Sequence, residues 1–395
     1  MTERSTTPML LAHPFRPFFL LTGVYGVLVV LAWFCFLFAG LTLPLGWSPL
    51  QWHSHEMLYG LIPAAIAGFV LTAMCNWTGA RPLQDGGLLA LILLWLMGRL
   101  VMWLAGWLPA WLVALVDLAF LPVLAVYVTR ILLHHGNRRN LILVAVLAML
   151  FMGNLLMHIG FVSGDPGWLR IGQQQGLDLI MLLMVIIAGR IIPAFTANWL
   201  RNAGGDADRV FRSPWTDRLA ITGVVLLIPL GWWSGESTAL GVVALLAAMA
   251  NALRLVQWRG WLAAREPLLW ILHLAYFWIV SALLLRGIAA FTPVIPDNLW
   301  QHLLGVGAMG TLILGVMTRV AMGHTGRPLK LPKYGLAIYI AIIAATVLRV
   351  LAAAHLMDYR LGVSLAALFW VLAFGLFVIL YLPILARPRA DGRPG

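Results

Sequence analysis

Long apolar stretches separated by short polar breaks are the dominant pattern along the chain. Stretches of about 20 apolar residues recur throughout, and an α-helix needs this length to cross a hydrocarbon layer about 30 Å thick. Most breaks are rich in proline and glycine, which end helices. We therefore predict an all-α, polytopic membrane protein with twelve transmembrane helices. The predicted spans are 17–39, 54–75, 88–106, 110–133, 141–163, 173–197, 217–234, 238–256, 267–290, 299–322, 334–355 and 361–385.

No stretch of the sequence predicts a soluble domain. The longest polar stretch, 200–216, is short and lies near the middle of the chain. The first apolar run lacks a small-residue cleavage site and is long enough to span, so it is predicted to be a helix and not a signal peptide. Residues 1–395 are therefore predicted to form a single integral membrane domain.

Composition agrees with this prediction. Hydrophobic residues make up 62% of the chain and charged residues 10%, with a mean hydropathy of +0.93. Soluble domains carry roughly 45–50% apolar and about 25% charged residues. The two cysteines exclude a disulfide scaffold. The net charge of +12 comes without a long basic run, so we predict the lipid bilayer as a partner and no nucleic acid.

The distribution of basic residues predicts the orientation. With the N-terminus inside, 19 of the 26 Lys and Arg residues fall on the same side of the membrane. Only Arg170 and Arg360 fall on the other side, and the rest lie within spans. Because Lys and Arg are enriched in cytoplasmic loops, both termini are predicted to be cytoplasmic.

Several ionisable residues fall within the predicted spans. A charge in the hydrocarbon costs about 2.5–3.5 kcal/mol on insertion scales, so such residues are functional candidates. The alternative is that they are paired structural charges or that they snorkel from span ends. These residues are Glu56, Arg99, Asp117, Asp178, Arg190, Arg286, Arg319 and Arg349.

Histidines gather at the predicted outer face. The sequence WHSHEM at 52–57 opens the second span, and His302 enters the tenth span at the same depth as His55. His158 lies on the fifth span. Neutral imidazole is a common ligand for haem iron, copper and zinc. The pattern predicts a haem or metal site, and the alternative is histidines that pack and form hydrogen bonds.

The region around His55 recurs later in the chain. Residues 55–83 and 302–329 align at a constant offset of 247. The matches are His55 with His302, Gly60 with Gly307, Gly68 with Gly315, and Thr78–Gly79 with Thr325–Gly326. The sixth span is a weaker third copy, in which Asp178 matches Glu56. We predict three four-helix pseudo-repeats, with chance similarity between Gly-rich apolar helices as the alternative.

Arginines mark the inner ends of these copies. Arg190 lies in GRIIPAFTANWL at 189–200, and Arg319 lies in TRVAMGHTGRPL at 318–329. Arg is the fitting partner for a carboxylate, so both could hold haem propionates. The alternative is that these motifs end helices and anchor them at the interface.

Taken together, these motifs resemble the NnrS family. The matching pieces are FRPFFLL at 15–21, WHSHEMLYG at 52–60, NWTG at 76–79, GRIIPAFT at 189–196 and GVMTRVAMGHTGRPL at 315–329. The resemblance implies a twelve-span bacterial inner-membrane protein that contains haem and copper. It also implies a link to denitrification and to resistance against nitric oxide and nitrosative stress. The family's His-bearing motifs fall on His53, His55, His302 and His324.

The arrangement is also similar to the catalytic subunits of haem-copper oxidases and nitric oxide reductases. In those subunits, spans two and ten carry the haem ligands. This chain has no histidine on the predicted spans six or seven, where copper ligands would belong, so that copper site is not carried over.

We predict a haem protein, with haem of the b type and a possible copper ion, that binds nitric oxide from the periplasmic side. If it is an enzyme, it is an oxidoreductase that reduces nitric oxide with electrons from a membrane or periplasmic donor. His55 and His302 would ligate haem iron, and His53, His158 and His324 would be further haem or metal ligands. Glu56 and Asp178 would orient an imidazole or move protons. Arg190 and Arg319 would pair with propionates.

Two functions of other classes stay open at this point. Twelve spans with internal repeats are equally typical of a proton-coupled secondary transporter, here of a small anion. A haem-based sensor or assembly factor for nitric oxide without turnover is the other alternative. The sequence contains no P-loop, CxxC, HExxH or GxSxG motif, so phosphoryl and acyl transfer are not expected.

Overall fold

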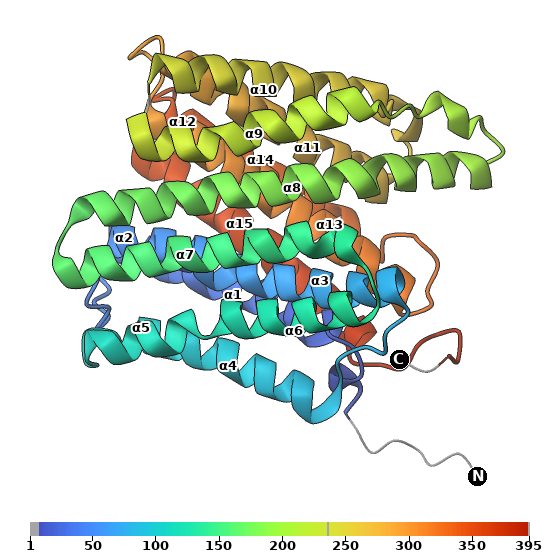
Figure 1. Cartoon of the computed structure of the whole chain (residues 1–395), viewed down its shortest axis with the longest axis horizontal. Helices are drawn as coiled ribbons and strands as arrows, with labels where there is room; N and C mark the ends of the chain where they lie inside the picture. Colours follow the sequence, from blue (N-terminus) through green and yellow to red (C-terminus); the bar gives the residue numbers. More distant parts are fainter. Residues whose placement is uncertain (1–7, 235–236, 394–395) are drawn as a thin grey trace. The chain divides into compact units, whose positions relative to one another are not determined.

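The computed structural model describes residues 8–234 and 237–393, and these residues form helices and loops with no β-strand. The chain divides into two compact units. The first unit contains residues 1–176, 320–328 and 377–395, and the second contains residues 177–319 and 329–376. Figure 1 follows the helices along the chain. We describe each unit by itself.

Most helices of the first unit come from the N-terminal half of the chain. Residues 56–61 form a π-helical segment between α2 and α3. The α-helices are α1 (Phe15–Phe38), α2 (Pro49–His55), α3 (Ile62–Thr78), α4 (Asp85–Trp103), α5 (Ala110–Leu118), α6 (Phe120–His134), α7 (Leu141–Ser163) and the first part of α8 (Pro166–Asn202). Short 3₁₀ turns lie at Met9–Leu11 and Arg138–Asn140.

The second unit contains a second π-helical segment, at residues 303–310 between α12 and α13. Its other α-helices, with the greater part of α8, are α9 (Pro214–Ser234), α10 (Thr238–Gln257), α11 (Pro267–Ala289), α12 (Asp297–His302), α13 (Thr311–His324), α14 (Gly335–Ala353) and α15 (Tyr359–Leu385). The ends of α13 and α15 belong to the first unit. Short 3₁₀ turns lie at Ala207–Arg209 and Gly260–Ala263.

The all-α prediction is confirmed. Among the described residues, eleven helical stretches are long and apolar enough to cross a membrane, and they overlap eleven of the twelve predicted spans. The remaining predicted span, 217–234, lies within α9. This helix starts with polar residues, including Asp217 and Arg218, which lower its hydropathy. That residues 1–395 act as one integral membrane domain stays a prediction.

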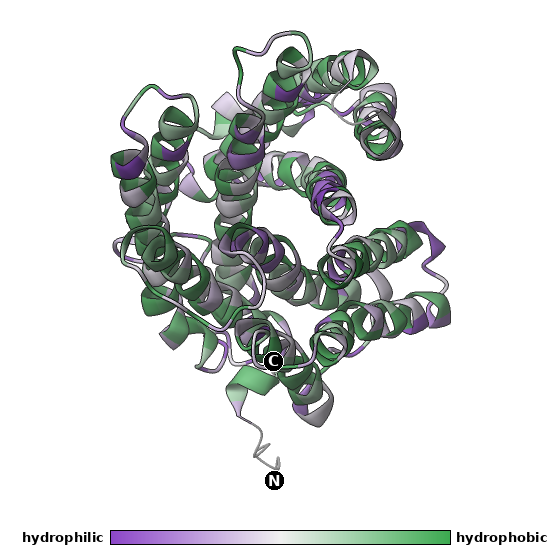
Figure 2. Cartoon of the chain, turned by 90° about the vertical axis from the view of Figure 1, so that its left-hand side faces the viewer, coloured by the Kyte–Doolittle hydropathy of each residue, from purple (hydrophilic) through white to green (hydrophobic). Residues whose placement is uncertain are grey.

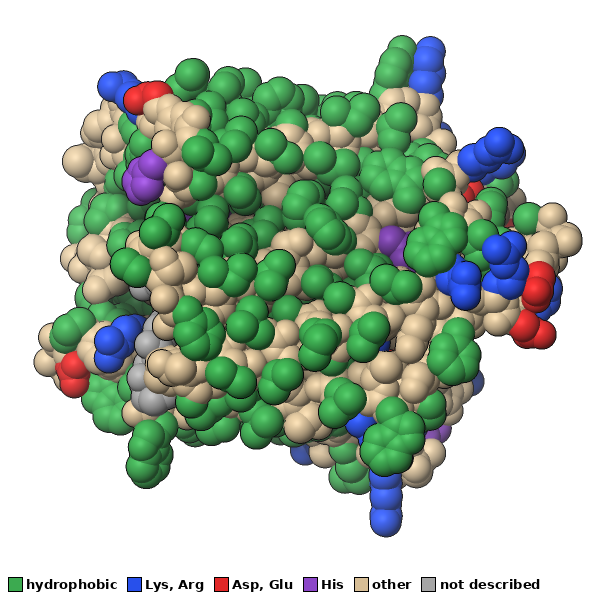
Figure 3. All heavy atoms as spheres, turned by 90° about the horizontal axis from the view of Figure 1, so that it is seen from above, with side chains coloured by type: hydrophobic (Ala, Val, Ile, Leu, Met, Phe, Trp, Pro, Cys, Tyr) green, Lys and Arg blue, Asp and Glu red, His purple; other side chains and the backbone are tan. Residues whose placement is uncertain are grey.

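The surface agrees with a membrane setting. Hydrophobic residues run along most of the helices (Figure 2). In Figure 3, hydrophobic side chains are spread over the face in view, and most charged side chains lie along its edges. Large apolar side chains such as Leu28, Leu93 and Ile340 are exposed. Because backbone polar groups must be satisfied within each span, helices are the structure that this composition favours.

The first unit brings together the two ends of the chain. The buried Arg16 guanidinium donates hydrogen bonds to the carbonyl oxygens of Leu385, at 2.5 Å, and Arg387, at 2.9 Å. The start of α1 and the end of α15 therefore lie side by side in this unit. Their cytoplasmic location stays a prediction, and Arg4, one of the counted basic residues, lies outside the described residues.

The two copies of the internal repeat share local structure. A π-helical segment starts directly after His55 and another directly after His302. A Cβ added at Gly68 would lie 2.8 Å from Phe19 of α1, and one added at Gly315 would lie 2.8 Å from Leu272 of α11. The matching glycines thus allow equally close packing in each unit. The third copy differs, because residues 166–202 form an uninterrupted α-helix.

Candidate metal centre

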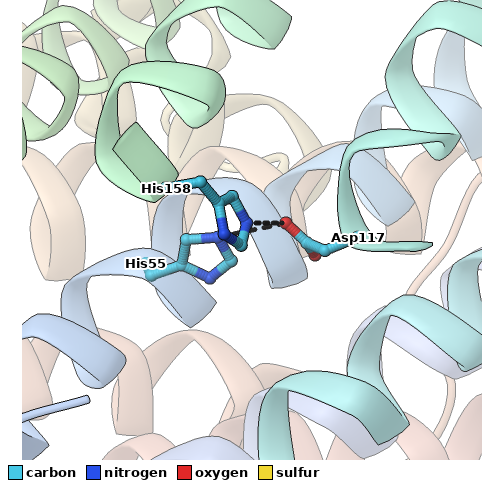
Figure 4. A group of neighbouring side chains, drawn as sticks. All are labelled: His55, Asp117 and His158. Atoms are coloured by element: carbon cyan, nitrogen blue, oxygen red, sulfur yellow. Dashed lines mark hydrogen bonds and ion pairs between the residues drawn. The ribbon is translucent and has the colours of Figure 1, made fainter. Parts of the chain in front are cut away.

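Three buried side chains of the first unit converge on one point. His55 ends α2, Asp117 lies on α5 and His158 lies on α7 (Figure 4). One ligand atom from each residue lies within 4.8 Å of the other two. The Asp117 Oδ2 atom lies 3.2 Å from His55 Nε2 and 2.9 Å from His158 Nε2. Two imidazoles and a carboxylate form a donor set that suits several transition metals.

Local structure explains why His55 and its neighbour both face the interior. Ser48 caps α2 through a reciprocal capping box with Gln51, which fixes where the helix begins. Adjacent residues in an α-helix point about 100° apart, yet His55 and Glu56 are both fully buried. The π-helical segment starts at Glu56. π-Helical turns carry an extra residue and are frequent at functional sites.

A buried arginine joins two carboxylates beside the histidines. The Arg99 guanidinium donates to Glu56 Oε1 at 2.5 Å and to Asp117 Oδ1. Gly60 leaves the room for this guanidinium, because a Cβ there would meet both Arg99 and Glu56. The Tyr25 hydroxyl donates to the other Glu56 oxygen. The whole group is therefore held by charge-assisted hydrogen bonds, the stronger kind in proteins.

The hydrogen-bond partners of His55 show that a cation or a second proton belongs here. Its Nδ1 atom lies 2.9 Å from Glu56 Oε1, and its Nε2 atom lies 2.8 Å from Asn154 Oδ1. The Asn154 amide nitrogen donates to Asp117, so its oxygen faces the imidazole. Both ring nitrogens therefore meet oxygen acceptors, whereas a neutral imidazole carries a single N–H. An imidazolium, a protonated carboxylate or a metal ion satisfies this arrangement.

The formal charges lead to the same conclusion. Glu56, Asp117 and Arg99 together leave one negative charge when both imidazoles are neutral. Bonds from a metal to nitrogen or oxygen of about 2.0–2.2 Å place neighbouring ligand atoms about 3 Å apart. The two nitrogen-to-oxygen distances at Asp117, 3.2 and 2.9 Å, match this spacing. The residues therefore fit a metal ion.

Aromatic rings enclose the two imidazoles. The Trp47 ring centroid lies 5.2 Å from that of His55 and 5.3 Å from that of His158. Phe161 stacks on Trp47 at 4.7 Å, and the imidazoles lie 5.4 Å apart. These apolar rings keep water away and raise the strength of the charge interactions inside.

The comparison with protein families agrees with the motifs. The sequence matches the family described as NnrS protein over residues 9–389. The chain belongs to the NnrS family. The match covers nearly the whole chain and includes every residue of the centre, and it confirms the resemblance that the motifs indicated. No curated protein matches the chain.

In this NnrS family member, the other predicted ligands of the first unit lie outside the three-residue cluster. The His53 ring stacks on Trp33 with centroids 4.4 Å apart. His324 lies near the chain ends, with its ring 6.0 Å from His13 and 5.5 Å from Phe15. Their roles as haem or metal ligands stay predictions.

The second unit contains His302 and Asp178. His302 Nδ1 lies 2.7 Å from the Asn298 carbonyl oxygen, and His302 Nε2 lies 2.8 Å from an Arg349 nitrogen. Asp178 accepts a hydrogen bond from Arg286 at 2.5 Å. Ligation of haem iron by His302 stays a prediction. The role of Asp178 in orienting an imidazole or moving protons also stays a prediction.

The two arginines proposed for propionates also belong to the second unit. The Arg319 guanidinium lies over the Phe195 ring, 4.4 Å from its centroid. Arg190 is a half-buried residue of α8. A cation over an aromatic face is a typical structural contact. Binding of propionates by Arg190 and Arg319 stays a prediction.

Haem does not fit His55 as this residue is placed. Both of its ring nitrogens contact oxygen atoms of Glu56, Asn154 and Asp117. The rings of Trp47 and His158 pack against it as well. Ligation of haem iron would also displace the packed rings, whereas a single ion bound to His55 Nε2, Asp117 and His158 would replace the contact with Asn154 and leave the contact of Nδ1 with Glu56 in place.

Sequence reasoning noticed Asp117 and Arg99 but did not place them in the site. Their signal was the cost of a charge within a span, which requires a partner for each. The partner of a buried acid depends on which helices pack together, and the sequence order of the spans does not give that.

Proposed function

We propose that this NnrS family member is a metalloprotein of the bacterial inner membrane that binds nitric oxide at the His55–Asp117–His158 centre. The observation that carries the proposal is the buried set of two imidazoles and one carboxylate, beside a second carboxylate and a single arginine that both carboxylates share. Copper is the ion that the family resemblance implies, and the same donors also suit iron and zinc. Haem ligation by His55 and His302 is not used in this proposal.

The bound metal would supply an electrophilic, redox-active position for a diatomic ligand. The surrounding residues would set its geometry. Glu56 holds His55 through Nδ1, which orients the ring as second-layer carboxylates do in metal sites. Arg99 fixes both carboxylates. Nitric oxide is small and apolar, so it would enter from the lipid without an open channel.

The proposal extends to the reduction of nitric oxide at this centre. Two nitric oxide molecules, two electrons and two protons give nitrous oxide and water. Glu56 contacts both the Tyr25 hydroxyl and the His55 ring, so it is placed to hold a proton beside the metal. The electrons would come from a membrane or periplasmic donor. Nitrous oxide formed with a chemical reductant distinguishes a reductase from a protein that only binds nitric oxide.

The test starts with protein purified from membranes. Metal content is measured by mass spectrometry, and nitric oxide is titrated while optical and electron paramagnetic resonance spectra are recorded. We expect a metal ion and a spectral response in the wild type, and loss of both in His55→Ala and His158→Ala. His134→Ala is the matched control, because this histidine is exposed at the end of α6.

Two results would contradict the proposal. The first is unchanged metal content and response in both centre variants. The second is a wild type that takes up neither copper nor iron on reconstitution. Without metal and without a haem Soret band, the transporter alternative would be favoured, because internal repeats and buried charges are typical of transporters.

A further inference from the structure

The second unit contains a counterpart of the arginine in the metal centre. The helices α4 and α14 both have 19 residues. Arg99 lies fourteen residues after the first residue of α4, and Arg349 lies fourteen residues after the first residue of α14. Each helix follows one copy of the internal repeat. The repeat therefore extends one helix beyond the part that the sequence alignment indicated.

Packing supports this correspondence. A Cβ at Gly60, in the first π-helical segment, would meet Arg99 of α4. A Cβ at Gly307, in the second segment, would lie 3.0 Å from Thr346 of α14. In each unit, the helix that carries the arginine thus lies against the π-helical segment. Arg349 reaches the start of its segment, where it contacts His302.

The two copies differ in their negative charges. Arg99 pairs with Glu56 and Asp117. At the repeat offset of 247, Leu303 stands where the first copy has Glu56. The second π-helical segment, α14 and α15 contain no Asp or Glu. Asp297 of α12 is the nearest acid in sequence before this segment. Among the described side chains, no acidic group pairs with Arg349 as Glu56 and Asp117 pair with Arg99.

The contacts of Arg349 are with neutral groups. Its Nη2 atom lies 2.8 Å from His302 Nε2, and the ring of Tyr359 lies 5.9 Å away. The His302 Nδ1 atom faces a carbonyl oxygen, so Nδ1 donates and Nε2 accepts from the guanidinium. Among the described residues, the buried Nη1 atom of Arg349 has no hydrogen-bond partner. The guanidinium therefore has a buried donor without an acceptor, and no ion pair to it is found in the part of the chain that the structure describes.

We propose that Arg349, with its guanidinium positioned by His302, binds an oxyanion. A guanidinium matches carboxylate and phosphate groups with two parallel hydrogen bonds. Arg349 lies four residues before the end of α14, about 6 Å from that end at 1.5 Å per residue. The site is thus within reach of the aqueous phase and of lipid headgroups. The oxyanion is either a small soluble anion or a headgroup phosphate, and the proposal does not depend on the metal centre.

The first experiment measures the midpoint of thermal unfolding in two media. In detergent, inorganic phosphate is compared with chloride at equal ionic strength. In lipid nanodiscs, phosphatidylcholine alone is compared with phosphatidylcholine that also contains phosphatidylglycerol. We expect phosphate or the anionic lipid to raise the midpoint in the wild type and in Arg360→Gln, an exposed arginine of α15. The rise should be absent in Arg349→Gln.

The outcomes separate the two sources of the anion. A rise with phosphate in detergent indicates a soluble anion, and a rise with phosphatidylglycerol alone indicates a headgroup. An equal rise in Arg349→Gln, or none in the wild type, would overturn the proposal. The metal content of Arg349→Gln should equal that of the wild type, so failure here is distinct from failure at the His55 centre.

A second variant restores the missing acid. Leu303→Glu places a carboxylate at the position of Glu56 in the first copy, and Leu303→Gln is its neutral control. We expect Leu303→Glu to lose the response to the anion because Arg349 gains an internal partner, while Leu303→Gln keeps the response. Equal responses in the two variants would contradict the equivalence of the copies. If Leu303→Glu does not fold, the comparison of Arg349→Gln with Arg360→Gln still decides the proposal.

Discussion

Replacing Asp117 by Asn tests the centre most directly. The carboxylate accepts hydrogen bonds from Arg99, from His158 at 2.9 Å and from Asn154 at 2.8 Å, and it lies 3.2 Å from His55 Nε2. Asparagine has nearly the same volume, so packing is preserved. The substitution removes the charge and turns one acceptor into a donor that faces either the guanidinium or the His55–His158 cluster.

The expected cost follows from these contacts. Breaking a buried ion pair costs about 3–5 kcal/mol when the other charge is left alone. Here Arg99 keeps Glu56, so we expect a loss of about 3 kcal/mol in the free energy of unfolding. At about 1.4 kcal/mol per factor of ten, the folded population falls about a hundredfold relative to the unfolded. Metal affinity should fall by more than the 10–100-fold that removal of a second-layer partner costs.

The assay combines the midpoint of thermal unfolding with metal analysis of the purified protein. Asp208→Asn is the control, because this carboxylate is exposed in the loop before α9 and should change neither quantity. Asp117→Asn with wild-type stability would refute the ion-pair reasoning. Asp117→Asn with wild-type metal content would refute the assignment of the ligand.

Three further changes test neighbouring parts of the structure. Gly60→Ala should lower the free energy of unfolding by about 1–3 kcal/mol by overpacking, because the new Cβ would lie 3.0 Å from Glu56 Oε2. Gly305→Ala should be tolerated, because a Cβ there would have no atom within 4 Å. Equal unfolding midpoints of the two variants would contradict this reasoning. Tyr25→Phe removes the hydroxyl that donates to Glu56 and should cost about 1–3 kcal/mol, measured by the same midpoint. Burial, followed by the charges nearby, lowers the pKa of His13 to about 3. The unfolded chain takes up a proton on His13 near pH 6.5 and the folded chain does not. The free energy of unfolding should therefore fall below pH 6.5, by at most about 1.4 kcal/mol per pH unit. In His13→Asn, the free energy of unfolding should depend less on pH between pH 7.5 and 5.

The sequence by itself determined the fold class and the position of nearly every helix. Each predicted span overlaps one helix or a run of consecutive helical segments of the structure. The reason is that the bilayer leaves little choice: backbone groups must be satisfied internally and apolar residues must face lipid. His55 and His158 were predicted as ligands from the sequence, and Asp117 and Arg99 were marked as charges that are costly within a span.

Tertiary structure decided which of these charges meet. The sequence marked Glu56 and Asp178 as candidate acids, and the structure gives Glu56 the partner Arg99 and Asp178 the partner Arg286. Asp117 became the carboxylate of the centre because α5 and α7 pack together. Helix order along a chain does not specify helix neighbours, since every span has apolar faces that can pack in several ways.

The π-helical segments were also beyond the sequence. Residues 56–61 and 303–310 contain ordinary helix-forming residues and glycine, and their hydrophobic pattern is that of any buried helix. The extra residue in the turn is selected by packing, where it lets His55 and Glu56 face the interior together. Composition thus fixed the helices, and contacts between helices fixed the chemistry, because a buried charge takes its properties from its neighbours in space.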